Sequence, residues 1–138
     1  MGKEAYLKQV MKAANSCPYY RLLGMRVKEI KGGKSRIVMP FKQDLTHPYG
    51  IAHVGAIASL ADSAVAMALI DLVDPKDRIA TIEFKVNFFA SVQEGELKAY
   101  AKIIHKGSKT AVGDVEVFDG KGKLVAKSIA TYSIQRND

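Results

Sequence analysis

One acidic side chain stands inside the most apolar stretch of the sequence. Asp62 lies about two turns into residues 53–73, whose apolar positions recur with helical spacing, so it is too far inside to cap that helix. No residue three or four positions away is a cation. Because a buried carboxylate is costly without a partner, we expect Asp62 to face a cleft, meet another element or hold a proton, as functional carboxylates do. A structural carboxylate that bonds a loop or Ser63 is the alternative.

The start of the same helix offers hydrogen-bond donors. The first N–H groups of a helix are unpaired and carry partial positive charge. Val54 and Gly55 follow the small or flexible residues Gly50 and Ala52, so a carbonyl oxygen can reach their amides. Such donors stabilise the oxyanion of acyl transfer. An ordinary junction between loop and helix is the alternative, and Asp62 favours the first interpretation.

The amino-terminal third predicts the first elements that must position these groups. Apolar residues at three-and-four spacing over residues 4–15 indicate an amphipathic helix, and a second helical turn follows around Pro18. Residues 25–30 and 35–39 have strand composition, and a turn with two glycines joins them into a hairpin. A loop without periodicity then leads to the apolar helix.

The rest of the chain predicts a sheet around that helix. The helix is apolar on almost every side, so it must be buried on most of them, and we expect it to end at Asp74 and Pro75. Alternating residues then predict four strands, and the short turns between them favour a four-stranded antiparallel meander. The strands are residues 82–88, 97–103, a segment around 115–117, and 123–134. We predict an α+β fold in which one curved antiparallel sheet wraps around a long central helix.

Composition limits the classes of protein. The 138 residues suit one domain, 1–138, with a helical segment at 1–24. No apolar run reaches the roughly 20 residues that span a bilayer, and the first residues show no apolar signal segment, so we expect a cytoplasmic protein without a membrane segment. The net charge of +7 favours anionic partners, such as a phosphorylated cofactor. We do not expect a nucleic-acid partner, because no basic aromatic strand or recognition helix is present.

Other reactive side chains lack a supporting pattern. His47 and His53 are six residues apart without a further ligand cluster, so we expect no metal site. The single cysteine, Cys17, fits a reducing compartment and has no catalytic context. Ser59 and Ser63 lie in no nucleophile elbow, so a serine triad is not supported.

Several segments together resemble one known family. His53-Val54-Gly55 followed by Leu60-Ala61-Asp62-Ser63-Ala64 resembles the signature of hotdog-fold thioesterases, specifically the PaaI-like, phenylacetate-degradation-type acyl-CoA thioesterases. Segments 81–89, 107–110 and 122–126 resemble later parts of these proteins, and the similarity covers residues 22–134. The resemblance implies a hotdog fold and hydrolysis of an aryl or short to medium acyl-CoA to free acid and coenzyme A. It implies no cofactor beyond the coenzyme A of the substrate, and a homodimer or a tetramer built as a dimer of dimers.

The resemblance also implies roles for single residues. Asp62 matches the carboxylate that acts as nucleophile or general base, and Thr81 matches a hydroxyl that helps to hold the attacking water. Val54 matches the residue whose backbone N–H holds the thioester oxygen. His53 matches a histidine that shapes this loop and polarises the carbonyl, and His47 lies where the family usually has asparagine.

The sequence departs from the family pattern at two positions, and one turn offers residues for the phosphates of the substrate. Val54 replaces a glycine of the family and His47 replaces the asparagine, which leaves substrate range and rate open, including a module that binds acyl-CoA without hydrolysing it. Lys106, Ser108 and Lys109 lie in a turn between strands, where they can meet the phosphates of coenzyme A; lysines that are only solvated are the alternative. A hotdog hydratase is disfavoured, because such enzymes place an Asp and a His close together, and His53 and Asp62 are not in that arrangement.

Overall fold

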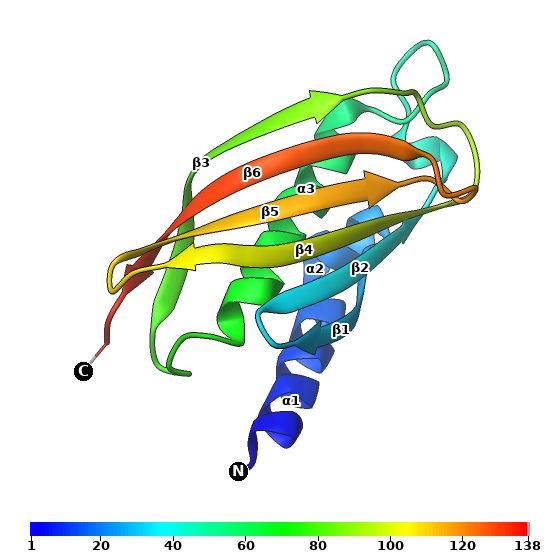
Figure 1. Cartoon of the computed structure of the whole chain (residues 1–138). Helices are drawn as coiled ribbons and strands as arrows, with labels where there is room; N and C mark the ends of the chain where they lie inside the picture. The colour runs from blue at the N-terminus through cyan, green and yellow to red at the C-terminus, as the bar shows by residue number, and fades with distance from the viewer. Residues whose placement is uncertain (138) are drawn as a thin grey trace.

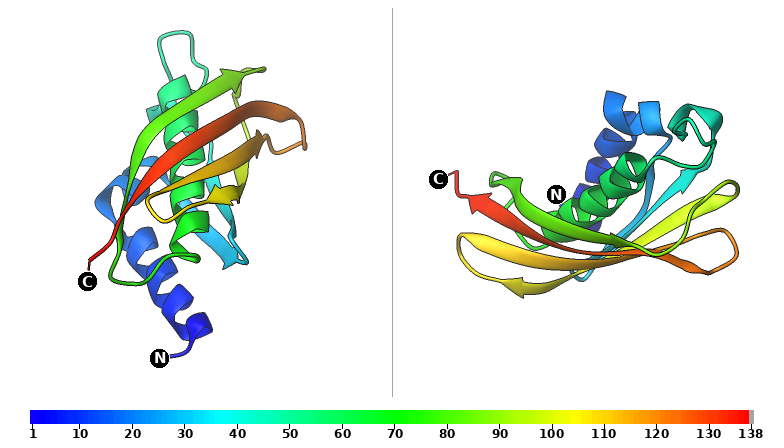
Figure 2. Two further views of the ribbon diagram at one scale, coloured as in Figure 1. Left: turned by 60° about the vertical axis from the view of Figure 1, so that its left-hand side comes forward. Right: turned by 90° about the horizontal axis from the view of Figure 1, so that it is seen from above.

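A long helix lies on the concave face of a six-stranded antiparallel sheet (Figures 1 and 2). The computed structural model describes residues 1–137. The sheet curves around helix α3 as predicted, and the other helices lie on the same side of it. The elements in chain order are α1 Lys3–Ser16, α2 Pro18–Leu23, β1 Arg26–Lys31, β2 Lys34–Pro40, the 3-10 helix η1 Gln43–Leu45, α3 Val54–Ile70, β3 Arg78–Phe88, β4 Glu96–Lys106, β5 Thr110–Phe118 and β6 Leu124–Gln135.

The strand order corrects one prediction. The sheet runs β1-β2-β4-β5-β6-β3, so only β4, β5 and β6 form a meander, and β3 pairs with β6 at the far edge. Strands β2 and β4 pair directly, whereas α3 separates β2 from β3 in the sequence. The loop 89–95 makes the crossing and is fixed where Ala52 N–H donates to the Val92 carbonyl at 2.9 Å. A four-stranded meander was therefore wrong because the turn before β4 is a crossover and not a hairpin.

Helix α3 ends at Ile70, before the predicted stop at Asp74 and Pro75. The next residue, Asp71, is buried, and its Oδ2 accepts the Gly33 N–H at 2.8 Å. The Lys3 ammonium lies 3.3 Å from its Oδ1. Asp71 thus ties the end of α3 to the β1–β2 hairpin and to α1, which fixes the direction in which the chain leaves the helix.

Small residues let α3 approach the sheet closely. Its buried face includes four alanines, and Gly113 of β5 lies directly opposite Val65. A Cβ atom at Gly113 would overlap Cγ1 of Val65, so only glycine fits between helix and strand. This contact sets the depth at which α3, and with it Asp62, lies above the sheet.

Strand β3 is the exception to a well-buried sheet. The inward rows of β4, β5 and β6 are buried, but nearly all of β3 is exposed or half-exposed. Ile82 and Phe89 are 58% and 57% exposed, and Phe84 and Phe88 are also exposed. An apolar edge strand of this kind needs a cover.

Among residues 1–137, no helix is both long and apolar enough to cross a membrane.

Candidate active site

The Asp62 carboxylate is held by two hydroxyl groups from the sheet. Thr81 Oγ1 lies 2.9 Å from Oδ1 and 3.1 Å from Oδ2 of Asp62. The Tyr132 hydroxyl lies 2.6 Å from Oδ1 and 2.7 Å from the backbone carbonyl oxygen of Asp62. Asp62 is half-buried, and no cation among residues 1–137 forms an ion pair with it. It meets partners from another element, one of the situations expected from the sequence, and keeps its access to solvent.

The pairing of β3 with β6 brings the two hydroxyls together. Thr81 and Tyr132 are direct partners in this antiparallel pair, so both side chains extend from the same face of the sheet toward α3. The register shifts between Thr81 and Glu83. A bulge of this type re-aims side chains, and here it lies beside the threonine that contacts Asp62.

Tyr132 is a site residue that the sequence analysis did not single out. It lies in the inward row of β6, where its neighbours two residues away are Ala130 and Ile134. A buried tyrosine needs a partner for its hydroxyl, and a tyrosine in a row of small and aliphatic residues was the available signal. Burial raises the pKa of Tyr132 well above its usual range, and the hydrogen bond to Asp62 raises this pKa further. The phenol therefore stays protonated and can donate to the carboxylate.

The start of α3 is exposed and partly occupied by its own cap. His53 precedes the helix, and its Nδ1 accepts the Gly55 N–H at 2.7 Å. A Cβ at Gly55 would lie 2.9 Å from that nitrogen, so the cap requires a residue without a side chain. The contact assigns the proton of a neutral His53 to Nε2. Because the Gly55 amide is engaged, the Val54 N–H is the backbone donor that has no acceptor among residues 1–137.

The second predicted histidine lies beside the first. His47 Nδ1 accepts the Tyr49 N–H at 3.0 Å, and the His47 N–H donates to the Ile51 carbonyl at 3.0 Å. The ring centroids of His47 and His53 are 6.5 Å apart. The structure thus brings both histidines and the Val54 amide together in one cluster at the start of α3, with the 89% exposed Tyr49 next to it.

The Val54 amide with its neighbouring histidines and the Asp62 carboxylate with its hydroxyl partners are separate within one chain. Val54 and Asp62 are eight positions apart on α3 (62 − 54), which places them about 12 Å apart along the helix axis at 1.5 Å per residue. A thioester carbonyl measures little more than 1 Å from carbon to oxygen. One chain therefore cannot bring its own Val54 amide and its own Asp62 to the same carbonyl group.

One of the predicted phosphate-binding residues, Lys106, lies on the same row of paired residues as Thr81 and Tyr132. Thr81 pairs with Tyr132, Tyr132 with Ala111, and Ala111 with Lys106. Three strand spacings separate Thr81 from Lys106, or about 14 Å. Lys106, Ser108 and Lys109 are all exposed, and the turn is fixed by the Ile134 N–H, which donates to the Lys109 carbonyl at 2.8 Å.

Helix α2 contacts α3 through a tyrosine hydroxyl. The Tyr19 hydroxyl lies 2.6 Å from Ser59 Oγ, which also donates to the Gly55 carbonyl at 2.9 Å. The neighbouring Tyr20 is buried, and burial raises the pKa of its phenol while a hydrogen bond with Ser63 lowers it. The bond between Tyr19 and Ser59 thus ties α2 to the first turns of α3.

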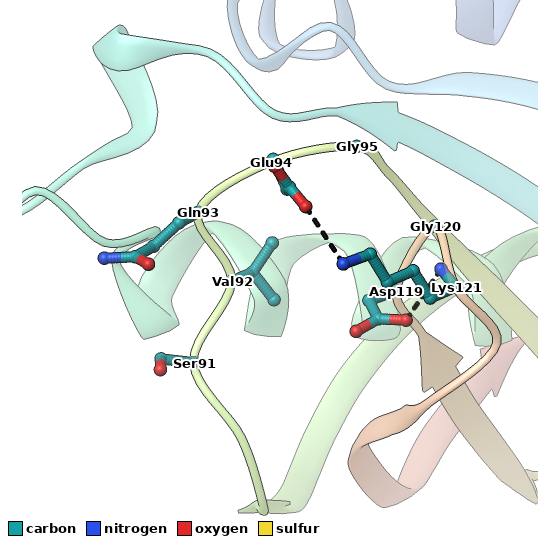
Figure 3. Close-up of a pocket in the computed structure, with 8 residues that line it drawn as sticks. All are labelled: Ser91, Val92, Gln93, Glu94, Gly95, Asp119, Gly120 and Lys121. Atoms are coloured by element: carbon teal, nitrogen blue, oxygen red, sulfur yellow. Dashed lines mark hydrogen bonds and ion pairs between the residues drawn. The ribbon is translucent and has the colours of Figure 1, made fainter.

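A cavity of about 650 Å³ lies away from Asp62, on the turns at one end of the sheet (Figure 3). The Lys121 ammonium and Glu94 carboxylate meet there at 3.4 Å, and both side chains are largely exposed. Asp62 does not line this cavity, so its volume belongs to a turn surface and not to the carboxylate site. Its lining residues are Ser91, Val92, Gln93, Glu94, Gly95, Asp119, Gly120 and Lys121.

Known proteins resemble this chain in sequence and in architecture. The family model of the thioesterase superfamily matches residues 49–126. The 1,4-dihydroxy-2-naphthoyl-CoA hydrolase of Escherichia coli K12 is 30% identical over 112 residues, which cover 81% of this chain and 82% of the relative.

Solved structures agree with the sequence matches. A thioesterase from Pseudomonas aeruginosa superposes with a TM-score of 0.85 at 26% identity, covering 92% of each chain. A thioesterase family protein from Silicibacter pomeroyi shares the fold, with a TM-score of 0.88 at 24% identity over 99% of this chain and 100% of its own. The family match spans more than half of the sequence, so the chain belongs to the thioesterase superfamily and is a hotdog-fold thioester hydrolase.

Proposed function

We propose that the protein hydrolyses an acyl-CoA, releasing a free acid and coenzyme A, with Asp62 as the reacting carboxylate. The observation that carries this proposal is an accessible Asp62 held by Thr81 and Tyr132 and free of any cation among residues 1–137. The signature around Asp62 favours the PaaI-like subgroup and an aryl or short to medium acyl chain. The name of the Escherichia coli relative, a naphthoyl-CoA hydrolase, supports an aryl group.

The helix start supplies the oxyanion site in this proposal. The thioester oxygen accepts the Val54 N–H, and a neutral His53, whose Nδ1 is already an acceptor, has its Nε2–H left to donate. His47 lies beside His53 and helps to orient the acyl group. Charge that develops on the carbonyl oxygen is thus met by donors that are already in place before the reaction.

Asp62 can act in two ways that end in the same products. As a nucleophile it attacks the carbonyl carbon, the thiolate of coenzyme A leaves, and water then hydrolyses the resulting anhydride. As a general base it takes a proton from a water held near Thr81, the hydroxide adds to the carbon, and the thiolate leaves with that proton. Both routes place one carboxylate oxygen of Asp62 close to the reacting carbon or water.

A second copy of the chain completes the site in this proposal. The separation of about 12 Å along α3 means that Val54 of one protomer and Asp62 of another must face the same thioester. The apolar edge strand β3, which carries the exposed Phe84 and Phe88, is the surface that a second copy would cover. We propose a homodimer as the active unit, which can pair into a tetramer.

The coenzyme A moiety then extends over the sheet toward the β4–β5 turn. Lys106 and Lys109 supply positive charge and Ser108 a hydroxyl at that turn, which suits the phosphates of the cofactor part of the substrate. The register that aligns Lys106 with Thr81 keeps this turn within reach of an extended coenzyme A bound at Asp62.

The test is thiol release from a panel of aryl and alkyl acyl-CoA substrates. Asp62→Asn keeps the shape of the side chain and removes its charge, so we expect a loss of at least about 10³ in kcat with the fold intact by circular dichroism. Asp77→Asn is the matched control, because Asp77 contacts a backbone N–H at Asn137, and it should keep the wild-type rate. Wild-type rates in Asp62→Asn would refute the assigned role. Tight acyl-CoA binding without thiol release by the wild type would refute hydrolysis and indicate a binding module.

A further inference from the structure

The two carboxylate oxygens of Asp62 have different surroundings. Oδ1 lies within 2.6 Å of the Tyr132 hydroxyl and 2.9 Å of Thr81 Oγ1. Oδ2 has a single neighbour of this kind among residues 1–137, Thr81 Oγ1 at 3.1 Å. Thr81 has one proton and lies within reach of both oxygens, so the difference between them is the Tyr132 hydroxyl, which contacts Oδ1 alone. Oδ2 then keeps its lone pairs for a water or an acyl carbon.

Tyr132 is held in a position from which its hydroxyl contacts Oδ1 and not Oδ2. Its side chain is 3% exposed and sits in the middle of the inward face of β6, so the ring has little freedom. The hydroxyl has one proton and two nearby acceptors, Oδ1 and the backbone carbonyl of Asp62. A charged oxygen is the stronger acceptor, so the proton is directed to Oδ1. The nearby carbonyl fixes where the hydroxyl oxygen lies relative to the turn of α3 that carries Asp62.

We propose that Tyr132 is a positioning residue of the reaction, which holds Oδ1 of Asp62 so that Oδ2 faces the reacting carbonyl or water. This role rests on the proposed function, in which Asp62 is the reacting group. It is distinct from the role of Thr81, which lies on exposed β3 and within reach of both carboxylate oxygens. The carboxylate without Tyr132 would rotate about its terminal torsion, which is broad in aspartate.

The first test separates positioning from binding. Tyr132→Phe keeps the ring and removes the hydroxyl, so we expect kcat for acyl-CoA hydrolysis to fall by about tenfold or more while KM changes by less than about twofold. Tyr19→Phe is the matched control, since the Tyr19 hydroxyl also bonds a side chain of α3, Ser59, and has no hydrogen bond to Asp62, and it should keep the wild-type kcat. An unchanged kcat in Tyr132→Phe would overturn the proposal, as would an equal fall in Tyr19→Phe.

The second test reads the contact without using catalysis. In urea unfolding of Tyr132→Phe, Asp62→Ala and the double variant, the double variant should lose less stability than the two single losses added together. In proton NMR of the wild type, the Tyr132 hydroxyl should exchange slowly, and Asp62→Ala should remove this signal. The NMR comparison does not require the Tyr132 variant to fold.

The outcomes of the two tests distinguish the two proposals. A wild type that hydrolyses no thioester refutes the proposed function and with it a positioning role, whatever the unfolding data show. An active wild type with additive stability losses, or with the same hydroxyl signal in Asp62→Ala, refutes the role of Tyr132 alone. A selective fall in kcat together with non-additive losses supports both.

Discussion

At the scale of single residues, one amide at the start of α3 is already hydrogen-bonded to the residue that caps the helix. The Gly55 N–H, one of two donors expected for an oxyanion, already donates to His53 Nδ1. The Val54 N–H lies next to it at the first helical position, on a residue that is 47% exposed. The proposed oxyanion site therefore depends on the donor that the capping histidine leaves available.

Val54→Pro tests this donor with little disturbance. Proline is well accepted at the first position of a helix, and His53, with φ −62° and ψ 134°, already has the extended conformation that a following proline requires. The change deletes the N–H, so we expect kcat for thioester hydrolysis to fall about 10²- to 10³-fold. Val54→Gly keeps the N–H and serves as the control. A Val54→Pro protein with a wild-type kcat would exclude this amide from the oxyanion site.

The sequence was informative about residues whose surroundings are local. Asp62 was conspicuous because the helix around it is apolar, and that follows from spacing alone. Tyr132 was not, because its partner lies 70 positions earlier and the contact exists only once β3 and β6 pair. The cap between His53 and Gly55 was also missed, since either a side chain or an incoming ligand can satisfy a free amide.

At the scale of elements, the depth of α3 is set by a glycine in the sheet. Every long-range contact of Asp62 described above requires α3 to lie close to β3 and β6. Gly113 of β5 permits this approach at Val65, one helical turn beyond Asp62. A packing contact in the core thus controls a distance at the site.

Gly113→Ala should therefore destabilise the protein. The added methyl group overlaps Val65, and overpacking of this kind costs about 1–3 kcal/mol in the free energy of unfolding. Urea denaturation measures the loss. Combining the change with Val65→Ala makes room for the methyl group, so the double variant should be more stable than the sum of the two single losses predicts. Wild-type stability in Gly113→Ala would contradict the close approach of helix and strand.

The elements themselves were largely predictable, and their order in the sheet was not. Alternation and turn residues identified the strands, and helical spacing identified α1 and α3. The position of β3 depends on a crossover after a helix, and residues 89–95 resemble an ordinary connection when read alone. Pairing between strands distant in the sequence is a property of the folded sheet, so a local pattern could not supply it.

At the scale of the whole molecule, a site shared between two copies predicts that two inactive variants can restore each other. In a dimer of Asp62→Asn with Val54→Pro, one of the two sites carries both defects and the other carries neither. Equal mixing gives half mixed dimers, so about a quarter of the wild-type activity should return. Thiol release after unfolding and refolding the mixture measures it, and each variant refolded alone is the control. No recovery in the mixture, with mixed dimers demonstrated by mass spectrometry, would place both groups of a site in one chain.

The exposed edge at β3 has a further consequence for such an enzyme. Each chain has a continuous hydrophobic core of its own, so in the proposed dimer we expect a separated monomer to stay folded and to hold only the halves of two different sites. Turnover per chain should then depend on protein concentration. We expect it to decline on dilution below the dissociation constant of the pair and to return when the solution is concentrated again.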